Sequence, residues 1–400
     1  MQVQMLVSIV LTLLSFCLFL PKYNAINSIS SVLAILIILY VYKGNLIAHM
    51  KRIPTELKTG FIVFLCSLII ASVGLNDKEC IRKAFDYVYY TAPFILMYLL
   101  AKIANNRWWV LFAFVIALAC TSGYGLYDFF LFNRKRLTGL YNSNATGSML
   151  AVMIPLTICY FSEYVRTCEK KNIIYIICAG TTMVLSVVAL FLTGSRGAIL
   201  GVIIGFIISG LLYAFKNFSG KKILSILAVI AVISGCSLYG LYNLNGNKFT
   251  RSYDGERLLL IESSYNMWRD NKLFGIGLTN WKEKYQGQYM LPEAKEPKLA
   301  TPHNVVMFYF STTGLIGGFG YVVFSLLILK YLFNNLVPIS SNGLYCLAIL
   351  WAFLAISLHG LVDIGITKKE IYRLLCGGLG LSVAMIELNR ERLFNNFREK

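Results

Sequence analysis

The stretch IIYIICAGTTMVLSVVALFLTGSRGAILGVIIGFIISGLLYAF, residues 173–215, holds two apolar runs separated by the short polar sequence TGSRG. Each run has roughly the 20 residues that an α-helix needs to cross the hydrocarbon core of a bilayer. Similar runs fill most of the chain, in which 57% of the 400 residues are hydrophobic and only 14% are charged. Soluble domains carry about 25% charged residues. The sequence therefore predicts an all-α polytopic membrane protein.

The apolar runs predict about twelve transmembrane helices. Their expected bounds are 3–20, 26–42, 60–75, 84–101, 108–132, 146–165, 173–192, 197–215, 223–242, 304–329, 339–361 and 371–388. The first run is followed almost at once by another and lacks a basic segment before it, so we interpret it as a membrane helix and not as a cleaved signal peptide. The ten cysteines are scattered and form no CxxC or Cys/His cluster, which argues against a disulfide framework and against a metal site.

The distribution of lysine and arginine predicts the orientation. If the N-terminus is cytoplasmic, every inner connection carries at least one cation, and residues 389–400 form a short basic cytoplasmic tail. Cytoplasmic loops are enriched in lysine and arginine, so we expect both termini inside and the long segment 243–302 outside. This bias also explains the net charge of +18 better than binding to nucleic acid does.

Some cations are expected on the outer face, against the insertion bias. Arg134, Lys135 and Arg136 lie in FNRKRLTG, and Arg196 lies in TGSRGA. Binding of an anionic ligand would explain them, whereas the alternative is a solvated loop that crosses the membrane regardless of charge. We favour solvation for the lysines of segment 243–302. Arg196 stands in a very short connection, where a charge is costly unless it is paired or functional.

The outer segment contains SYDGERLLLIESSYNMWRDN, residues 252–271, which has helical character. Ser252 or Asp254 can cap a helix that has Arg257 in its first turn. Spacings of three and four residues predict an apolar stripe suited to the membrane or to other helices. It comprises Leu258, Ile261, Tyr265 and Trp268.

The aromatic residues of the outer segment allow two interpretations. Trp268, Trp281, Tyr285 and Tyr289 suit either anchoring at the membrane interface or stacking on sugars. Interfacial anchoring is the commoner use of such residues.

The sequence TPHN, residues 301–304, precedes the expected helix 304–329. Pro302 suits the first turn of a helix, and His303 would then lie in that turn, among amide groups that disfavour a protonated imidazole. A neutral imidazole can act as a general base, whereas the alternative is a histidine that only caps or anchors the helix.

An acid is expected on the same face. Asp363 follows the expected helix 339–361, and His359 lies four residues before it, so the two side chains could bond to each other. Asp363 could instead orient His303 or pair with Arg196 or Arg257. Pairing of this structural kind is at least as reasonable as a direct catalytic role.

Three motifs resemble the O-antigen ligase and polymerase superfamily of bacterial envelope enzymes. They are LTGSRGA between two expected helices, ERLLLIESSYNMWRDNKLFGIGLTNW in the outer segment, and TPHNVVMFYFSTTGLIGG at the head of a later helix. Their order and spacing are more specific than any one motif. The resemblance covers roughly residues 185–365, and residues 1–180 match only as serial helices.

The resemblance implies a GT-C-like glycosyltransferase architecture in the bacterial inner membrane, with a periplasmic active site and one long periplasmic loop that contains a short amphipathic helix. It implies that residues 1–180 provide a scaffold and a lipid groove, that residues 181–388 form the catalytic membrane region, and that residues 389–400 form a cytoplasmic tail. The short tail differs from relatives that carry a large soluble domain there.

The implied activity is transfer of O-antigen glycan from undecaprenyl diphosphate to lipid A–core, by inverting glycosyl transfer without a metal or a cofactor. Carried over by motif, His303 is the catalytic base, Arg196 and Arg257 are the essential arginines, and Asp363 matches a late acid. His359 remains a rival for part of the role of His303. The expected substrate-binding residues are Arg196, Arg257, Arg136, Asn304 and Trp268.

Two alternative functions remain. A polymerase would extend the glycan on the same carrier, but many polymerases have a second large outer loop and only one is visible here. A transporter or flippase commonly shows internal repeats and helices broken at mid-membrane, and the sequence has no convincing repeat.

Overall fold

The computed structural model describes residues 2–20, 24–168, 172–220, 252–338 and 343–398. These residues form helices and connections without any strand. Ten of the described helices are long and apolar enough to cross a membrane. They are α1 (Gln2–Phe19), α2 (Asn24–Tyr42, continued by α3, Leu46–Lys51), α4 (Thr55–Gly74), α5 (Lys78–Ile103), α6 (Trp108–Leu131), α7 (Ser143–Thr167), α8 (Ile173–Leu192), α9 (Arg196–Asn217), α13 (Val305–Asn334) and α15 (Lys369–Arg398).

Ten of the twelve expected membrane helices correspond to these ten helices. α14 (Leu344–His359) is apolar but has only 16 residues, although we expected 339–361. It is followed by a turn and the short helix η4 (Gly365–Thr367). The expected helix 223–242 lies outside the described residues.

Close helix packing places α9 and α14 against each other in the bundle. Gly197, Gly201 and Gly205 follow one another at intervals of four residues along α9. A Cβ atom at Gly201 would overlap the carbonyl oxygen of Ala355 in α14. Between apolar helices in lipid, small residues allow this close approach and the dispersion contacts that come with it. The glycine stripe thereby sets the end of α14 beside Arg196 at the start of α9.

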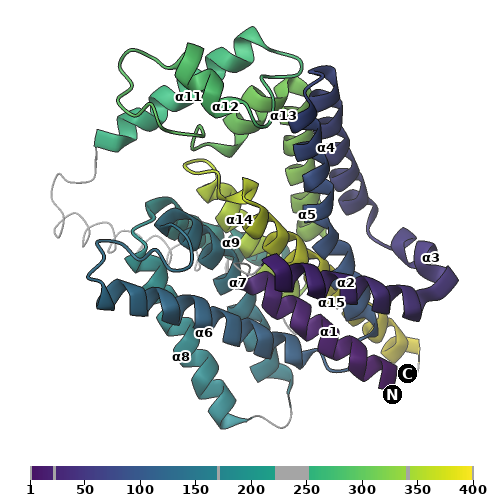
Figure 1. Ribbon diagram of the computed structural model, residues 1–400. Helices are drawn as coiled ribbons and strands as arrows, with labels where there is room; N and C mark the ends of the chain where they lie inside the picture. The colour runs from purple at the N-terminus through teal and green to yellow at the C-terminus, as the bar shows by residue number, and fades with distance from the viewer. Residues whose placement is uncertain (1, 21–23, 169–171, 221–251, 339–342, 399–400) are drawn as a thin grey trace.

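The outer segment folds into α11 (Ser252–Asp270), α12 (Trp281–Lys284) and the π-helical turn η2 (Tyr285–Tyr289). Figure 1 shows α11 and α12 gathered at one end of the molecule, next to the start of α13. Since α11 begins at Ser252, Arg257 lies in its second turn, and the predicted first-turn position is wrong.

The buried face of α11 is not the predicted apolar stripe. Leu260 and Met267 are buried together with Trp281 and Tyr285. The two aromatic rings stack at 4.9 Å, and the Trp281 Nε1–H donates a hydrogen bond to Ser264 Oγ at 3.0 Å. Trp281 and Tyr285 are therefore core residues, and their predicted use at the membrane interface or on sugars is wrong.

The opposite face of α11 carries the predicted stripe. Leu258 is 68% exposed and Tyr265 is 48% exposed. The Trp268 ring packs against Phe310 of α13 and against Tyr265.

A break in α13 holds the outer segment in place. Gly314 has a φ of +63°, so α13 is not helical at this residue. The carbonyl groups of Ser311 and Thr312, just before the break, accept hydrogen bonds from the Ile276 and Gly277 amides at 2.9 Å each. The Gly-x-Gly turn of the outer segment thus docks on the irregular turn of α13.

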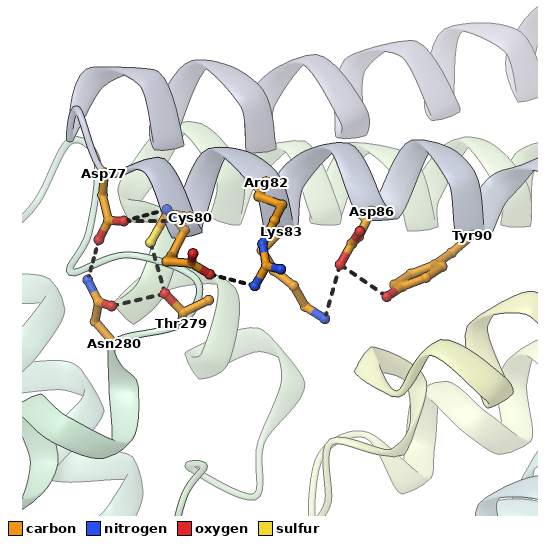
Figure 2. A network of polar contacts seen from close by, with 9 residues as sticks. Asp77, Cys80, Arg82, Lys83, Asp86, Tyr90, Thr279 and Asn280 are labelled. Carbon is orange, nitrogen blue, oxygen red and sulfur yellow. Dashed lines mark hydrogen bonds and ion pairs between the residues drawn. The ribbon is translucent and has the colours of Figure 1, made fainter.

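A second joint connects the same turn to α5 (Figure 2). Asp77 caps α5 by accepting hydrogen bonds from the Glu79 and Cys80 amides, and its other carboxylate oxygen accepts one from Asn280 Nδ2 at 2.9 Å. The Asn280 amide and the capped backbone N–H groups hold the pKa of Asp77 below its ordinary value. Together the two joints fix the outer segment, and with it Arg257, relative to the bundle.

Candidate active site

A cavity of about 640 Å³ lies where the outer segment meets the bundle. It is formed by the starts of α9 and α11, the end of α14, and the segments before α7 and α13. Its lining residues are Lys135, Arg136, Asn144, Gly194, Ser195, Arg196, Gly197, Glu256, Arg257, Leu260, Glu296, Leu299, His303, His359, Val362 and Asp363. The structure therefore brings together Arg136, Arg196, Arg257, His303 and Asp363, which come from distant parts of the sequence.

His303 lies just before α13 and not in its first turn, so that part of the prediction is wrong. Asn304 is the N-cap residue, and its side chain accepts a hydrogen bond from the Met307 amide at 2.9 Å. His303 has a φ of +50°, which turns the chain before the cap. Its imidazole is 23% exposed, and its Nδ1 is 3.7 Å from Asp363 Oδ1.

Backbone contacts hold His303 next to Asp363. The Val305 amide donates a hydrogen bond to the Gly360 carbonyl at 2.7 Å, and Asn304 Nδ2 donates one to the Leu361 carbonyl at 3.0 Å. The start of α13 is thus tied to the turn after α14, and Asp363 belongs to this turn.

Asp363 is a buried carboxylate with one oxygen that no described group satisfies. The residue is 4% exposed, and its Oδ1 accepts a hydrogen bond from the Ile364 amide at 2.7 Å. Its Oδ2 has no hydrogen-bond partner among the described residues. Burial raises the pKa of this carboxyl, but the neighbouring His303, His359 and Lys368 side chains outweigh burial and hold the pKa well below its usual range. Asp363 is therefore charged at neutral pH.

His359 has a different environment from His303. It is the last residue of α14 and only 1% exposed. Its Nδ1 lies 3.1 Å from Ser148 Oγ of α7, and this contact replaces the predicted bond between the His359 and Asp363 side chains. The packing of Gly197 against the His359 ring connects this buried pair to the start of α9.

The arginines line the cavity from three sides. Arg196 is the first residue of α9, Arg257 comes from α11, and both are half-buried. Arg136 Nε donates a hydrogen bond to the Thr193 carbonyl at 2.7 Å, and its Nη2 donates one to Asn144 Oδ1 at 2.9 Å. Arg136 thereby supports the connection that presents Arg196.

The other cations of FNRKRLTG divide between two roles. Lys135 lines the cavity. Arg134 instead lies 3.5 Å from Asp128 and over the ring of Phe132. Only part of this basic run therefore faces the cavity.

A second cavity of about 380 Å³ adjoins the first. Both are lined by Arg136, Asn144, His303 and Asp363, and the smaller cavity adds Lys368. The His303–Asp363 pair consequently stands between two cavities.

Two predicted substrate-binding residues, Trp268 and Asn304, line neither of these two cavities. Asn304 is engaged in the helix cap and in the bond to Leu361. Sequence reasoning missed Asn144, which lines both cavities from the start of α7, and Ser148, which contacts His359. Two polar residues four positions apart at the head of an apolar helix are the signal that could have found them.

A bundle of membrane-length helices that carries a cavity lined by arginines, a histidine and a carboxylate defines a polytopic membrane protein with a site suited to a polar anionic ligand. The comparison with protein families gives the class more closely. Residues 181–322, from α8 into α13, match the family described as O-antigen ligase. This match places residues 181–322 in the O-antigen ligase superfamily, as the sequence motifs predict. The matched region contains Arg196, Arg257 and His303. The comparison with curated proteins finds no match.

The family and the helices together support a coarse function. They indicate a multi-pass bacterial membrane protein with a glycosyltransferase-like role of the ligase or polymerase class, acting on glycan and lipid substrates.

Proposed function

We propose that the protein transfers O-antigen glycan from undecaprenyl diphosphate to lipid A–core on the periplasmic face of the inner membrane. The observation that carries this proposal is the convergence of Arg196, Arg257 and His303 on one cavity. The family match supports the ligase class. In this proposal residues 181–388 form the catalytic part of a GT-C-like enzyme, and residues 1–180 supply the scaffold and the lipid groove.

The larger cavity is proposed to take the diphosphate of the donor. Negative charge develops on the leaving oxygen as its bond to the sugar C1 breaks. Guanidinium groups remain charged and offer planar, bidentate donors to phosphate oxygens. Arg196 and Arg257 would stabilise this charge in the transition state, while Arg136 holds the connection before Arg196.

His303 is proposed as the general base. It accepts the proton of an acceptor hydroxyl, the hydroxyl oxygen forms a bond to C1, and undecaprenyl diphosphate leaves with the electron pair. A single displacement of this kind inverts the anomeric configuration. With Nδ1 on the side of Asp363, Nε2 is the nitrogen that faces the acceptor. The Asp363 carboxylate would orient the ring and stabilise the imidazolium that forms.

The second cavity gives the acceptor a place. An in-line displacement requires the acceptor and the leaving group on opposite sides of C1. His303 and Asp363 line both cavities, so we assign the donor diphosphate to the larger and the acceptor sugar to the smaller. Lys368 in the smaller cavity suits the phosphorylated sugars of a core acceptor.

The test is transfer by purified protein from undecaprenyl-diphosphate-linked glycan to lipid A–core. We expect His303→Ala to reduce the rate by about 10²–10⁴-fold, which is the usual contribution of a general base. His49→Ala is a matched control, because His49 packs on Tyr42 and lines neither cavity. Near-normal transfer by His303→Ala would rule out the assigned base.

The products of the same assay separate the ligase from the polymerase. A ligase forms core-linked glycan, whereas a polymerase lengthens the glycan on its carrier and leaves lipid A–core unmodified. Within the described residues, 252–304 form the longest segment outside the membrane-length helices, and this observation favours the ligase.

A further inference from the structure

A polar cavity of about 250 Å³ lies at the far end of the bundle from the candidate active site. The distance between the two cavities can be estimated along α7. Asn144 near the start of α7 lines the active-site cavity, and Thr167 at its end lines the polar cavity. Asn144 and Thr167 are 23 positions apart in the helix and so about 34 Å apart at 1.5 Å per residue, compared with about 30 Å for the hydrocarbon core of a bilayer. The polar cavity therefore lies at the opposite membrane boundary.

Asn389 lines this cavity with a buried side-chain amide. Asn389 of α15 is 8% exposed, and its Nδ2 has no hydrogen-bond partner among the described residues. Leaving such a donor unpaired is unfavourable, so an oxygen atom of a bound molecule would stabilise it. Arg107 also lines the cavity and directs its Nε to the Ala101 carbonyl at 3.2 Å. Glu163 is paired with Arg166 at 2.6 Å.

An apolar groove of about 870 Å³ adjoins the polar cavity. It runs between α1, α6 and the start of α8, and its lining includes Phe16, Phe112, Ile116 and Tyr175. Trp108 lines both the groove and the polar cavity. The two spaces thus meet at Trp108, with the polar cavity at the membrane boundary and the apolar groove along membrane-spanning helices.

We propose that this composite site binds one glycerophospholipid from the leaflet next to the segment 104–107. The phosphate meets the Arg107 guanidinium, which suits phosphate oxygens, and a glycerol or ester oxygen accepts the hydrogen bond from Asn389 Nδ2. The acyl chains lie in the groove. Because the site contacts α1, α6, α7 and α15, the lipid joins the N-terminal helices to the rest of the bundle. This inference is independent of the proposed reaction.

The experiment is native mass spectrometry of the purified full chain after extensive washing in detergent. We expect the wild type to retain one glycerophospholipid and to regain it when phosphatidylethanolamine is added back. Arg107→Gln removes the phosphate partner, and Ile116→Trp fills the groove. Each should weaken rebinding of phosphatidylethanolamine about tenfold or more, as expected for the loss of a charged hydrogen bond or of the space for an acyl chain.

Matched controls carry the same substitutions outside the site. Arg82→Gln alters an exposed arginine that pairs with Glu79, and Ile62→Trp alters an isoleucine of α4 that is 61% exposed. Both should retain lipid as the wild type does. If Arg107→Gln fails to fold, Ile116→Trp still tests whether the groove binds the lipid, because Ile116 is 36% exposed on the surface of the bundle. A wild type without lipid, site variants that rebind lipid normally, or retention of a prenyl phosphate in place of a glycerophospholipid would overturn the proposal.

Discussion

Asp363 is a charged carboxylate beside an imidazole, and its negative charge is what we expect to matter most. Asp363→Asn preserves the shape of the side chain but removes its charge and changes the group that faces His303 Nδ1. By analogy with other histidine bases that rely on a carboxylate, transfer should fall by about 10⁴-fold. Wild-type rates in Asp363→Asn, at a similar protein level in the membrane, would show that the carboxylate does not assist His303.

The same residue predicts a pH dependence of stability. The folded-state pKa of Asp363 is held below its ordinary value of 3.8, so its contribution is fully present above about pH 5 and is lost as the pH falls towards the lowered pKa. The wild type should therefore exceed Asp363→Asn in thermal unfolding temperature at about pH 5. This difference should shrink in more acidic buffers, and a difference that grew with acid would contradict the charge state assigned here.

Substitutions of Arg196 test whether its planar guanidinium binds the diphosphate through two hydrogen bonds. Arg196→Lys keeps the charge but loses the bidentate fork, whereas Arg196→Ala loses both. We expect transfer to fall by about 10²–10³-fold with alanine and by less, about tenfold, with lysine. Arg82→Ala, which changes an exposed arginine outside the cavity, should transfer at the wild-type rate. Equal effects of lysine and alanine would indicate that bidentate geometry is not used.

At the scale of elements, the contact between α9 and α14 positions Arg196 and His359. Gly201→Ala would place a methyl group on the Ala355 carbonyl, whereas Gly210→Ala on the same helix meets nothing within 4 Å. We expect Gly201→Ala to destabilise the protein by about 1–3 kcal/mol, as overpacking does, and to reduce transfer. Gly210→Ala should be neutral or stabilising by up to about 1 kcal/mol. Thermal unfolding of the two variants side by side measures the difference, and equal stability would contradict the described packing.

The membrane helices could be predicted from the sequence because each apolar run of about 20 residues carries its own signal. The end of α14 is harder to predict because the chain turns after His359, and the apolar residues that follow lead to Asp363 in the active site. The docking of Ile276 and Gly277 on the break at Gly314 could not be predicted, since it depends on backbone groups that are distant in sequence. The buried face of α11 could not be predicted for the same reason. It is buried by Trp281, which lies outside the helix and packs with Leu260 and Met267.

At the scale of the whole molecule, the sequence predicts that the charged residues of the site lie on the same face, but it does not predict their contacts. Arg196 is identified by its place in a very short connection, where a charge is costly without a function. His303 is identified by its place just before a membrane helix, and Arg257 by the motif resemblance. The partners Asn144 and Ser148 could not be identified in this way, because polar residues at the head of a helix are common. Only the fold brings Asn144 to Arg136 and Ser148 to His359. The N-cap at Asn304 displaced His303 from the predicted helical turn for a purely local reason.

The account rests on one spatial claim, which is that a single cavity binds the donor diphosphate beside the base. An experimental structure of the protein with undecaprenyl-diphosphate-linked glycan tests it most directly. We expect the diphosphate oxygens within hydrogen-bonding distance of Arg196 and Arg257, and the sugar C1 in the cavity that His303 lines. A diphosphate bound elsewhere, or separated from His303 by other parts of the protein, would contradict the claim.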